Sequence, residues 1–202
     1  MIILRCLILV FVAAVALFGG CRAPISSFAY WQPSISVQYA FAVGYGSPDL
    51  ISAYGMGPDI SSAIDLFNFA NTFRNTSGVQ FFFAGSGPFR FFADGGFDIA
   101  HPDRAAQRAL QWWHGTNILY AANTTFWLGS SGWNVSGSRF HLAVKKLALH
   151  EIGHTFRLAD QPIVCPSPQV SIMNVGCGVN DSSGNIPSDV TSCDNDGINI
   201  TY

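Results

Sequence analysis

The segment LALHEIGHTFRLAD, residues 147–160, holds two histidines four residues apart and the only glutamate of the chain. The other eleven of the twelve acidic residues are aspartates, so Glu151 is not a general solubilising charge. On an α-helix, residues four apart lie on the same face, so His150 and His154 can direct both imidazoles at one point. Glu151 is rotated by about 100° from His150, which places its carboxylate beside that point.

Two histidines in this spacing with an intervening glutamate are typical of zinc metalloproteases, in which the glutamate is the general base. Zinc lowers the pKa of a bound water toward about 7, and Glu151 would accept its proton and pass it to the leaving amine. A catalytic zinc needs a third protein ligand and an open fourth position. Asp160 is the candidate ligand if the helix ends soon after His154. Four later aspartates are alternatives: Asp181, Asp189, Asp194 and Asp196.

The stretch from His150 to Asp160 resembles the metzincin signature HExxHxxGxxH/D, with an aspartate as the third ligand, as in the snapalysins. The later sequence SIMN, residues 171–174, is similar to the Met-turn of matrixins and snapalysins, in which Met173 would lie beneath the metal. The resemblance implies a zinc-dependent metalloendopeptidase with one catalytic Zn²⁺ and a protein or peptide substrate. It also implies a zincin fold: a twisted, mostly parallel mixed sheet packed on the zinc-binding helix, then an irregular C-terminal part with the Met-turn and a short final helix.

One departure from the signature concerns the bend after the helix. Arg157 occupies the position of the family's glycine, where the chain turns toward the third ligand. A residue with a side chain in the left-handed conformation costs about 1–2 kcal/mol. Either Arg157 accepts this strain or the turn is built differently and Asp160 is displaced.

The pattern of the remaining chain predicts an α+β fold. Apolar residues recur at three- and four-residue spacing from Asp59 onward, which predicts an amphipathic helix, and a second helix is expected over 138–156. The expected strands do not alternate strictly with these helices, which excludes a doubly wound sheet. An extended substrate would lie along an edge strand, for which TNILYAA, residues 116–122, is the first candidate and FDIA, residues 97–100, the second. The expected strands are SISVQYAFAV, VQFFFAG, FRFFADGGFDI, TNILYAA and TTFWLGSSGW.

The N-terminus indicates export. An apolar run from Cys6 to Phe18 follows Arg5 and is too short to span a bilayer comfortably, so residues 1–20 are expected to be a signal peptide. The following Gly19-Gly20-Cys21 resembles a bacterial lipoprotein box, in which Cys21 would carry the lipid anchor. The protein would then be secreted or anchored to the cell envelope, with a single catalytic domain over residues 28–202.

Export permits disulfides, and four cysteines are candidates whose pairing stays open: Cys21, Cys165, Cys177 and Cys193. The loop ADGGFD could hold Ca²⁺ through Asp94 and Asp98, or be a plain turn. A formal net charge of −2 without a basic stripe excludes nucleic acid as a partner. The oligomeric state is not indicated.

Two further hypotheses compete with the enzyme. The chain could be a catalytically inactive envelope or adhesion module on a metzincin-like scaffold, which Arg157 favours and Glu151 opposes. Alternatively, His150 and His154 could be hydrogen-bonded residues of a core helix that bind no metal.

Overall fold

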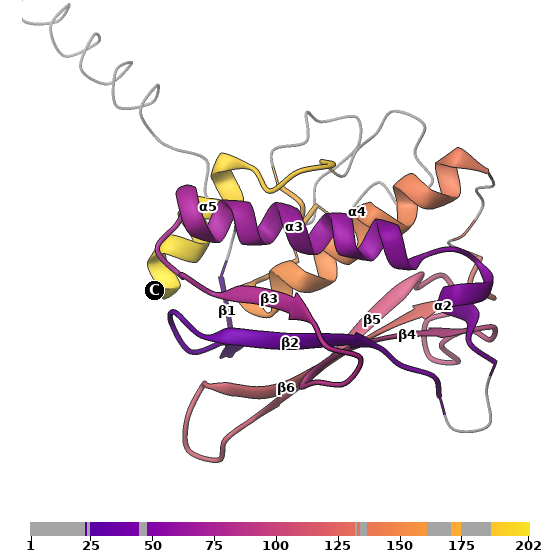
Figure 1. Cartoon of the computed structure of the whole chain (residues 1–202), viewed down its shortest axis with the longest axis horizontal. Coiled ribbons are helices and arrows are strands. Elements are labelled where there is room, and N and C mark those ends of the chain that lie inside the picture. Colours follow the sequence, from indigo (N-terminus) through magenta and orange to yellow (C-terminus); the bar gives the residue numbers. More distant parts are fainter. Residues whose placement is uncertain are drawn as a thin grey trace, which may run out of the picture.

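The computed structural model describes residues 23, 25–44, 48–131, 133, 137–160, 171–174 and 187–202. Within these ranges the chain is α+β, with a five-stranded sheet, a two-stranded ribbon and four helices (Figure 1). This agrees with the fold class expected from the sequence.

The five-stranded sheet is mixed and mostly parallel. Its order is β3-β2-β4-β6-β5; β2, β3, β4 and β6 run parallel, and β5 runs antiparallel to β6. Among the described residues, the edges of the sheet are therefore β3 and β5. The strands are β2 (Ser36–Phe41), β3 (Gln80–Phe83), β4 (Phe89–Asp94), β5 (Ala106–Trp112) and β6 (Leu119–Trp127).

Two long helices, α3 (Gly57–Phe73) and α4 (Ser138–His154), lie side by side on one face of the sheet (Figure 1). Helix α3 begins two residues before Asp59 and buries the predicted apolar face. It connects the parallel strands β2 and β3, as a crossover helix does. The shorter helices are α2 (Leu50–Ala53) and α5 (Ser192–Thr201).

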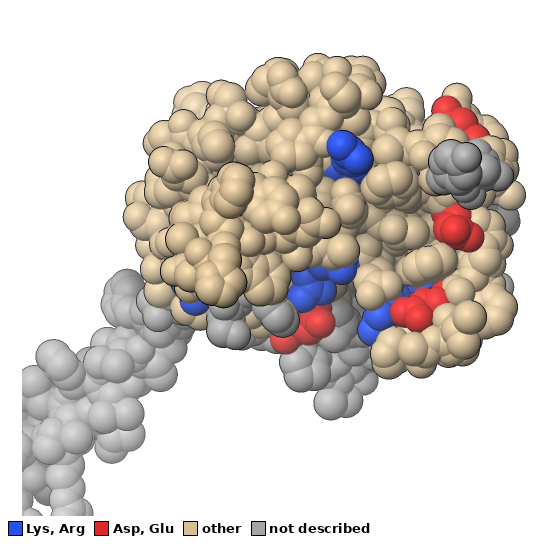
Figure 2. Space-filling model, turned by 90° about the horizontal axis from the view of Figure 1, so that it is seen from below, with Lys and Arg blue, Asp and Glu red and all other residues tan. Residues whose placement is uncertain are grey.

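The core between the sheet and the helices is rich in aromatic residues. The ring of Phe67 in α3 stacks on that of Phe156 at 5.2 Å, and Phe81 of β3 meets Phe156 edge-on. The face of the molecule that Figure 2 shows from below carries few charged side chains. No helix in the described ranges is both long and apolar enough to cross a membrane.

A two-stranded antiparallel ribbon joins the start of the chain to the segment after α4. Strand β1 (Ile25–Tyr30) pairs with β7 (Phe156–Leu158), with Ile25 opposite Leu158 and Tyr30 opposite Phe156. Ala23 is also buried, and its N–H donates to the carbonyl of Cys193 at 2.8 Å. Residues before position 28 therefore already take part in the packed fold.

The prediction of the edge strand was wrong. TNILYAA and TTFWLGSSGW contribute to a single strand, β6, which lies between β4 and β5, and FDIA lies in the connection before β5. The edge beside α4 is β5, whose sequence AQRALQW was not expected to be a strand. Alanine, glutamine, leucine and arginine favour helices, so pairing with β6 and packing on α4 override the local preference here.

Several predictions concern residues outside the described ranges: the signal peptide over residues 1–20, the lipid anchor at Cys21, and the cysteines at 165 and 177. Cys193 lies at the start of α5 and is disulfide-bonded.

Candidate metal centre

Helix α4 places His150 and His154 on one face of its last two turns. Both side chains are buried, and their ring centroids lie 4.7 Å apart. The helix ends at His154 with Thr155 as its C-cap, as the position of the third ligand requires.

Arg157 makes the bend that brings the third carboxylate back. Its φ of 68° is left-handed, so it adopts the conformation for which the metzincin signature has glycine. Two contacts hold it there: Nε donates to the carbonyl of Ser26 at 3.1 Å, and the guanidinium lies 5.5 Å from the ring centre of Tyr30. The chain then passes through β7, and the Asp160 carboxylate points back toward α4.

Three ligand atoms converge at this point. Oδ1 of Asp160 lies 3.2 Å from Nε2 of His150 and 3.1 Å from Nε2 of His154, and the two nitrogens are 3.2 Å apart. Three corners of a tetrahedron with bonds of about 2.0 Å are separated by about 3.3 Å. The spacing thus fits three ligands of one small tetrahedral cation. Among the described residues, these three form the only such group of histidine, cysteine and carboxylate side chains.

Hydrogen bonds on the far side of each imidazole set its tautomer. Nδ1 of His150 lies 2.9 Å from the carbonyl oxygen of Ile172, and Nδ1 of His154 lies 2.8 Å from that of Leu158. A carbonyl oxygen only accepts, so both Nδ1 atoms carry the proton and donate. In neutral rings, both Nε2 lone pairs then face the carboxylate oxygen, an arrangement that a cation between them stabilises.

The charges around the three converging atoms also favour a cation at this point. Burial disfavours the protonated form of His150, but the hydrogen bond to Asp160 and the charge of Glu151 outweigh it and raise the pKa of His150. Burial lowers the pKa of His154, and the neighbouring His150 adds to this. The contacts with Nε2 of His150 and of His154 hold the pKa of Asp160 well below its usual value. The carboxylate of Asp160 therefore stays ionised.

Residues 171–174, which resemble a Met-turn in sequence, lie directly against this site. Ile172 and Met173 are fully buried, and Ile172 supplies the carbonyl that orients His150. A Cβ at Gly153 would lie 2.7 Å from Sδ of Met173. The absence of a side chain at Gly153 therefore lets the methionine pack closely against α4.

Asp194 of α5 holds the Met-turn in place. Its carboxylate accepts hydrogen bonds from Oγ of Ser171 at 2.5 Å and from the backbone N–H of Ile172. It also accepts from the N–H and hydroxyl of Thr191, which completes a capping box at the start of α5. A chain of contacts thus runs from α5 through Asp194 and Ile172 to the ring of His150.

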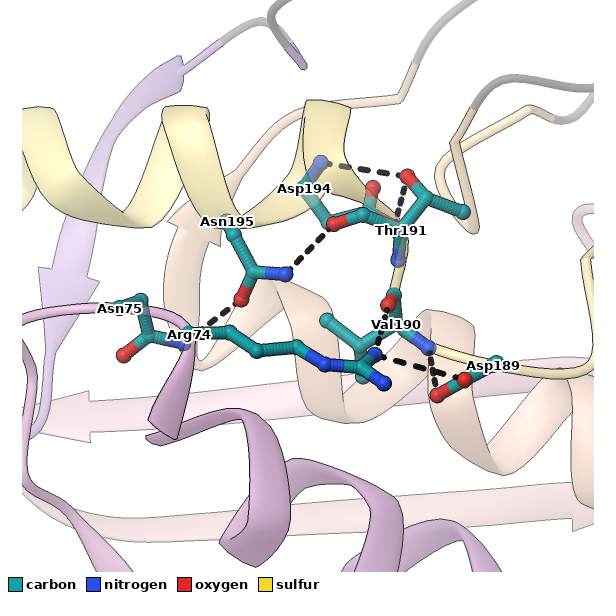
Figure 3. A network of polar contacts seen from close by, with 7 residues as sticks. All are labelled: Arg74, Asn75, Asp189, Val190, Thr191, Asp194 and Asn195. Atoms are coloured by element: carbon teal, nitrogen blue, oxygen red, sulfur yellow. Dashed lines mark hydrogen bonds and ion pairs between the residues drawn. The ribbon is translucent and has the colours of Figure 1, made fainter. Parts of the chain in front are cut away.

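Hydrogen bonds and an ion pair connect α5 and the residues just before it to the end of α3. Figure 3 shows Arg74 reaching Asp189 and the carbonyl of Val190, while Asn75 donates to Asn195 at 2.9 Å. The candidate metal centre is therefore supported by elements from the middle and the end of the chain.

Glu151 lies beside the three ligands, as its position on the helix predicts. It is 4 % exposed, and its Oε2 atom has no hydrogen-bond partner among the described residues. A buried carboxylate oxygen without a partner is costly unless a ligand or water completes it. Its position suits a group that exchanges a proton with a substrate or water at the site.

Arg108 is a residue of this site that the sequence did not reveal. It lies on β5 and shares the inward face of the strand with Ala106 and Leu110. Its charge interacts with those of Glu151 and Asp160, and it acts on His154 as well. No sequence motif marks it, because only the pairing of β5 beside α4 brings it here.

Other predicted ligands have different contacts. Asp189 forms an ion pair with Arg74 at 3.4 Å, and Asp194 accepts a hydrogen bond from Ser171. Asp196 lies on α5. Asp181 lies outside the described residues. The proposed calcium ligands are also in use: Asp94 accepts from the N–H of Gly96, and Asp98 pairs with Arg104 at 2.8 Å. These contacts favour a plain turn in the ADGGFD loop.

No known family model matches the sequence, and no curated protein matches it significantly.

Proposed function

We propose that the protein is a zinc-dependent metalloendopeptidase of metzincin type, with His150, His154 and Asp160 as the zinc ligands. The observation that carries the proposal is the convergence of two Nε2 atoms and one carboxylate oxygen at mutual distances of 3.1–3.2 Å. Two neutral nitrogens and one carboxylate are a donor set that catalytic zinc sites use, and they leave a fourth position open.

Zinc in this position would activate a water and polarise the carbonyl of a peptide bond. Glu151 accepts a proton from the attacking water and delivers it to the nitrogen of the leaving amine. Its burial next to the ligands supports this role. The carbonyls of Ile172 and Leu158 keep both histidines in the tautomer that presents Nε2.

Substitution of the general base tests the proposal. Glu151→Gln preserves the size of the side chain but removes its ability to take up a proton, so peptide cleavage should fall about 10²- to 10⁴-fold. Zinc content, measured by atomic emission, should stay near one ion per chain. The proposal fails if the mature protein binds no stoichiometric zinc, or if Glu151→Gln cleaves as fast as the unmodified protein.

Arg157 bears on the choice between an enzyme and an inactive binding module. An Arg157 that displaced Asp160 would have favoured the binding module, but its left-handed backbone directs the carboxylate to the histidines. Chelator-sensitive cleavage of a generic peptide substrate separates the two functions.

We also propose that the enzyme acts outside the cytoplasm. The apolar N-terminus is the first reason. The disulfide at Cys193 is the second, because structural disulfides are rare in the cytosol. Fractionation of cells, followed by detection of the mature protein, tests this location.

A further inference from the structure

The hairpin between β5 and β6 carries exposed aromatic side chains at its tip. Trp112, Trp113 and Tyr120 are 48 %, 61 % and 42 % exposed. The rings of Trp113 and Tyr120 contact each other, with centroids 4.8 Å apart. Large apolar side chains that gather at one exposed point of a fold indicate an interaction surface.

The side chains at the tip point to both faces of the hairpin. The pairing of the two strands continues past the end of β5, since the N–H of Trp113 donates to the carbonyl of Ile118 at 3.1 Å. Neighbouring residues of an extended chain point to opposite faces, so Trp112 and Trp113 lie on opposite sides. The flat surface of a protein partner would cover one of these faces, whereas lipid surrounds both faces of a hairpin tip that enters it.

The chemistry of the hairpin suits the boundary between lipid and water. Trp and Tyr combine an apolar ring with one polar group, and both are enriched at membrane–water interfaces. From Ala109 to Ser138 the sequence contains no aspartate, glutamate, lysine or arginine, so the tip takes none of these charges into lipid. The left end of the molecule in Figure 2, where Figure 1 places the hairpin, shows no acidic side chain that anionic headgroups would repel.

The hairpin also lies close to the part of the chain for which the sequence predicts export and a lipid anchor. Tyr30, at the end of β1, donates its N–H to the carbonyl of Asn117 at 2.8 Å and forms a bridge with Ile118. Strand β1 begins at Ile25 and therefore spans roughly 20 Å. A lipid on Cys21 would bring a membrane within about one strand length of the hairpin tip. This proximity favours lipid over other apolar partners.

We infer that the tip of the β5–β6 hairpin inserts Trp112, Trp113 and Tyr120 into the headgroup region of a lipid membrane and holds the domain against it. The inference goes beyond the proposed peptidase and does not depend on bound zinc. It adds the place at which the enzyme works, because cleavage would then occur at the membrane surface.

Co-sedimentation with vesicles tests the inference. The protein is used as residues 21–202, which include every described residue but not the apolar run, because that run would bind lipid by itself. The vesicles are loaded with sucrose and consist of phosphatidylcholine alone or of phosphatidylcholine with phosphatidylglycerol. Binding to both kinds is expected, because burial of the aromatic rings does not require a charged headgroup.

Two substitutions assign the binding to the hairpin. Trp112→Ala and Trp113→Ala should each lower the partition coefficient about tenfold, since each removes a large apolar side chain whose exposed part is buried on insertion. Phe97→Ala is the matched control and should bind like the unmodified protein. Phe97 is 50 % exposed, but it lies in the connection between β4 and β5, at the opposite end of the sheet. Thermal melting establishes that each variant is folded.

Tryptophan fluorescence gives a second readout that does not depend on loss of binding. Brominated phosphatidylcholine quenches tryptophans that reach the lipid, so it should quench the unmodified protein. Trp113→Phe keeps an apolar ring at the tip and should retain most of the binding, but it should be quenched less. Equal quenching of both proteins would show that Trp113 stays outside the lipid.

The remaining outcomes separate lipid from other partners. Absence of binding to either kind of vesicle would overturn the inference. Binding to anionic vesicles alone, unchanged in both alanine variants, would assign the attraction to charge and also overturn it. A dimer in lipid-free sedimentation velocity that Trp113→Ala dissociates would assign the tip to a second copy of the chain instead. Glu151→Gln should bind vesicles like the unmodified protein, so failure of the peptidase proposal leaves this inference intact.

Discussion

Arg157 lies where the chain leaves α4 and returns to the candidate metal centre. Its left-handed backbone is uncommon for a residue with a side chain; among the described residues only Ser34 shares it. The hydrogen bond to Ser26 and the contact with Tyr30 both reach strand β1. The bend is thus held by side-chain contacts with the β1–β7 ribbon, whereas the metzincin signature relies on a glycine.

The stabilities of two variants at Arg157 distinguish the cost of its left-handed backbone from the contribution of its side-chain contacts. Arg157→Ala and Arg157→Gly both lose the contacts with β1, which contribute about 1–2 kcal/mol together. Only glycine relieves the backbone strain, while its freedom in the unfolded chain offsets part of that gain. We therefore expect Arg157→Gly to be more stable than Arg157→Ala by about 0.5–1 kcal/mol in urea denaturation. If alanine proved the more stable variant, the left-handed bend would be refuted.

At the scale of elements, the site depends on the close approach of the Met-turn to α4. Gly153 faces Met173 across this contact, and an added Cβ would also lie 3.2 Å from Cδ1 of Ile172. The turn that orients His150 is therefore in direct contact with the helix that carries it.

Gly153→Ala should destabilise the protein, although replacing glycine by alanine usually stabilises a helix. In an exposed helix this change stabilises by about 1 kcal/mol. Here we expect destabilisation of about 1–3 kcal/mol from overpacking, together with weaker zinc binding, because Ile172 must shift away from His150. The double variant Gly153→Ala/Met173→Ala should recover most of the stability in thermal melts. A stabilised single variant would show that the turn does not lie against the helix.

Asp194 connects α5 to residues 171–174 through hydrogen bonds. Because Asp194 can ionise, its contribution to stability depends on pH. Burial raises the pKa of Asp194 above its usual value of 3.8 and outweighs the hydrogen bonds from Ser171 and Thr191. The folded protein thus binds this proton more tightly than the unfolded chain does. The stability that the proton confers is present below pH 3.8 and is lost as the pH rises through the folded pKa.

Asp194→Asn should therefore be compared with the unmodified protein over a range of pH. At neutral pH the variant loses hydrogen bonds from Thr191 or Ser171, at a cost of about 1–3 kcal/mol. As the pH falls toward 4, the unmodified protein should gain stability relative to the variant, which cannot titrate at this position. Denaturant midpoints at several pH values measure the difference. A difference that shrinks on acidification contradicts a raised pKa.

The sequence predicted those parts of the fold in which local pattern and packing agree. The apolar spacing from Ile60 to Ala70 predicted α3. HEIGH predicted the second helix and the proximity of His150 and His154, since helical periodicity alone brings these two side chains together. Strand β5 escaped prediction because its residues favour a helix, and β7 because three residues carry no periodicity. Arg108 and Asp194 reach the site only through tertiary packing, which no local pattern contains.

At the scale of the whole molecule, the candidate metal centre joins regions that are distant in the chain. Helix α4 supplies two of the three converging side chains, the chain after β7 supplies the third, and residues 171–174 orient one of them. Strand β1 supports the bend, and α5 supports the turn. A cation at the site would therefore stabilise the folded domain as a whole, because the unfolded chain cannot assemble these ligands.

Zinc should accordingly raise the melting temperature. At a free concentration about a thousandfold above Kd, binding adds about 4 kcal/mol to the free energy of unfolding. For a domain of this size each kcal/mol raises Tm by about 2–4 °C, so a shift of about 10 °C is expected in calorimetry, and a chelator should reverse it. Glu151→Gln should retain the shift because Glu151 is not a ligand, whereas His154→Gln should lose it. If zinc shifted the Tm of both variants equally, the assignment of His154 as a ligand and Glu151 as the general base would be wrong. The interpretation of α4 as a catalytic helix would then fail as well.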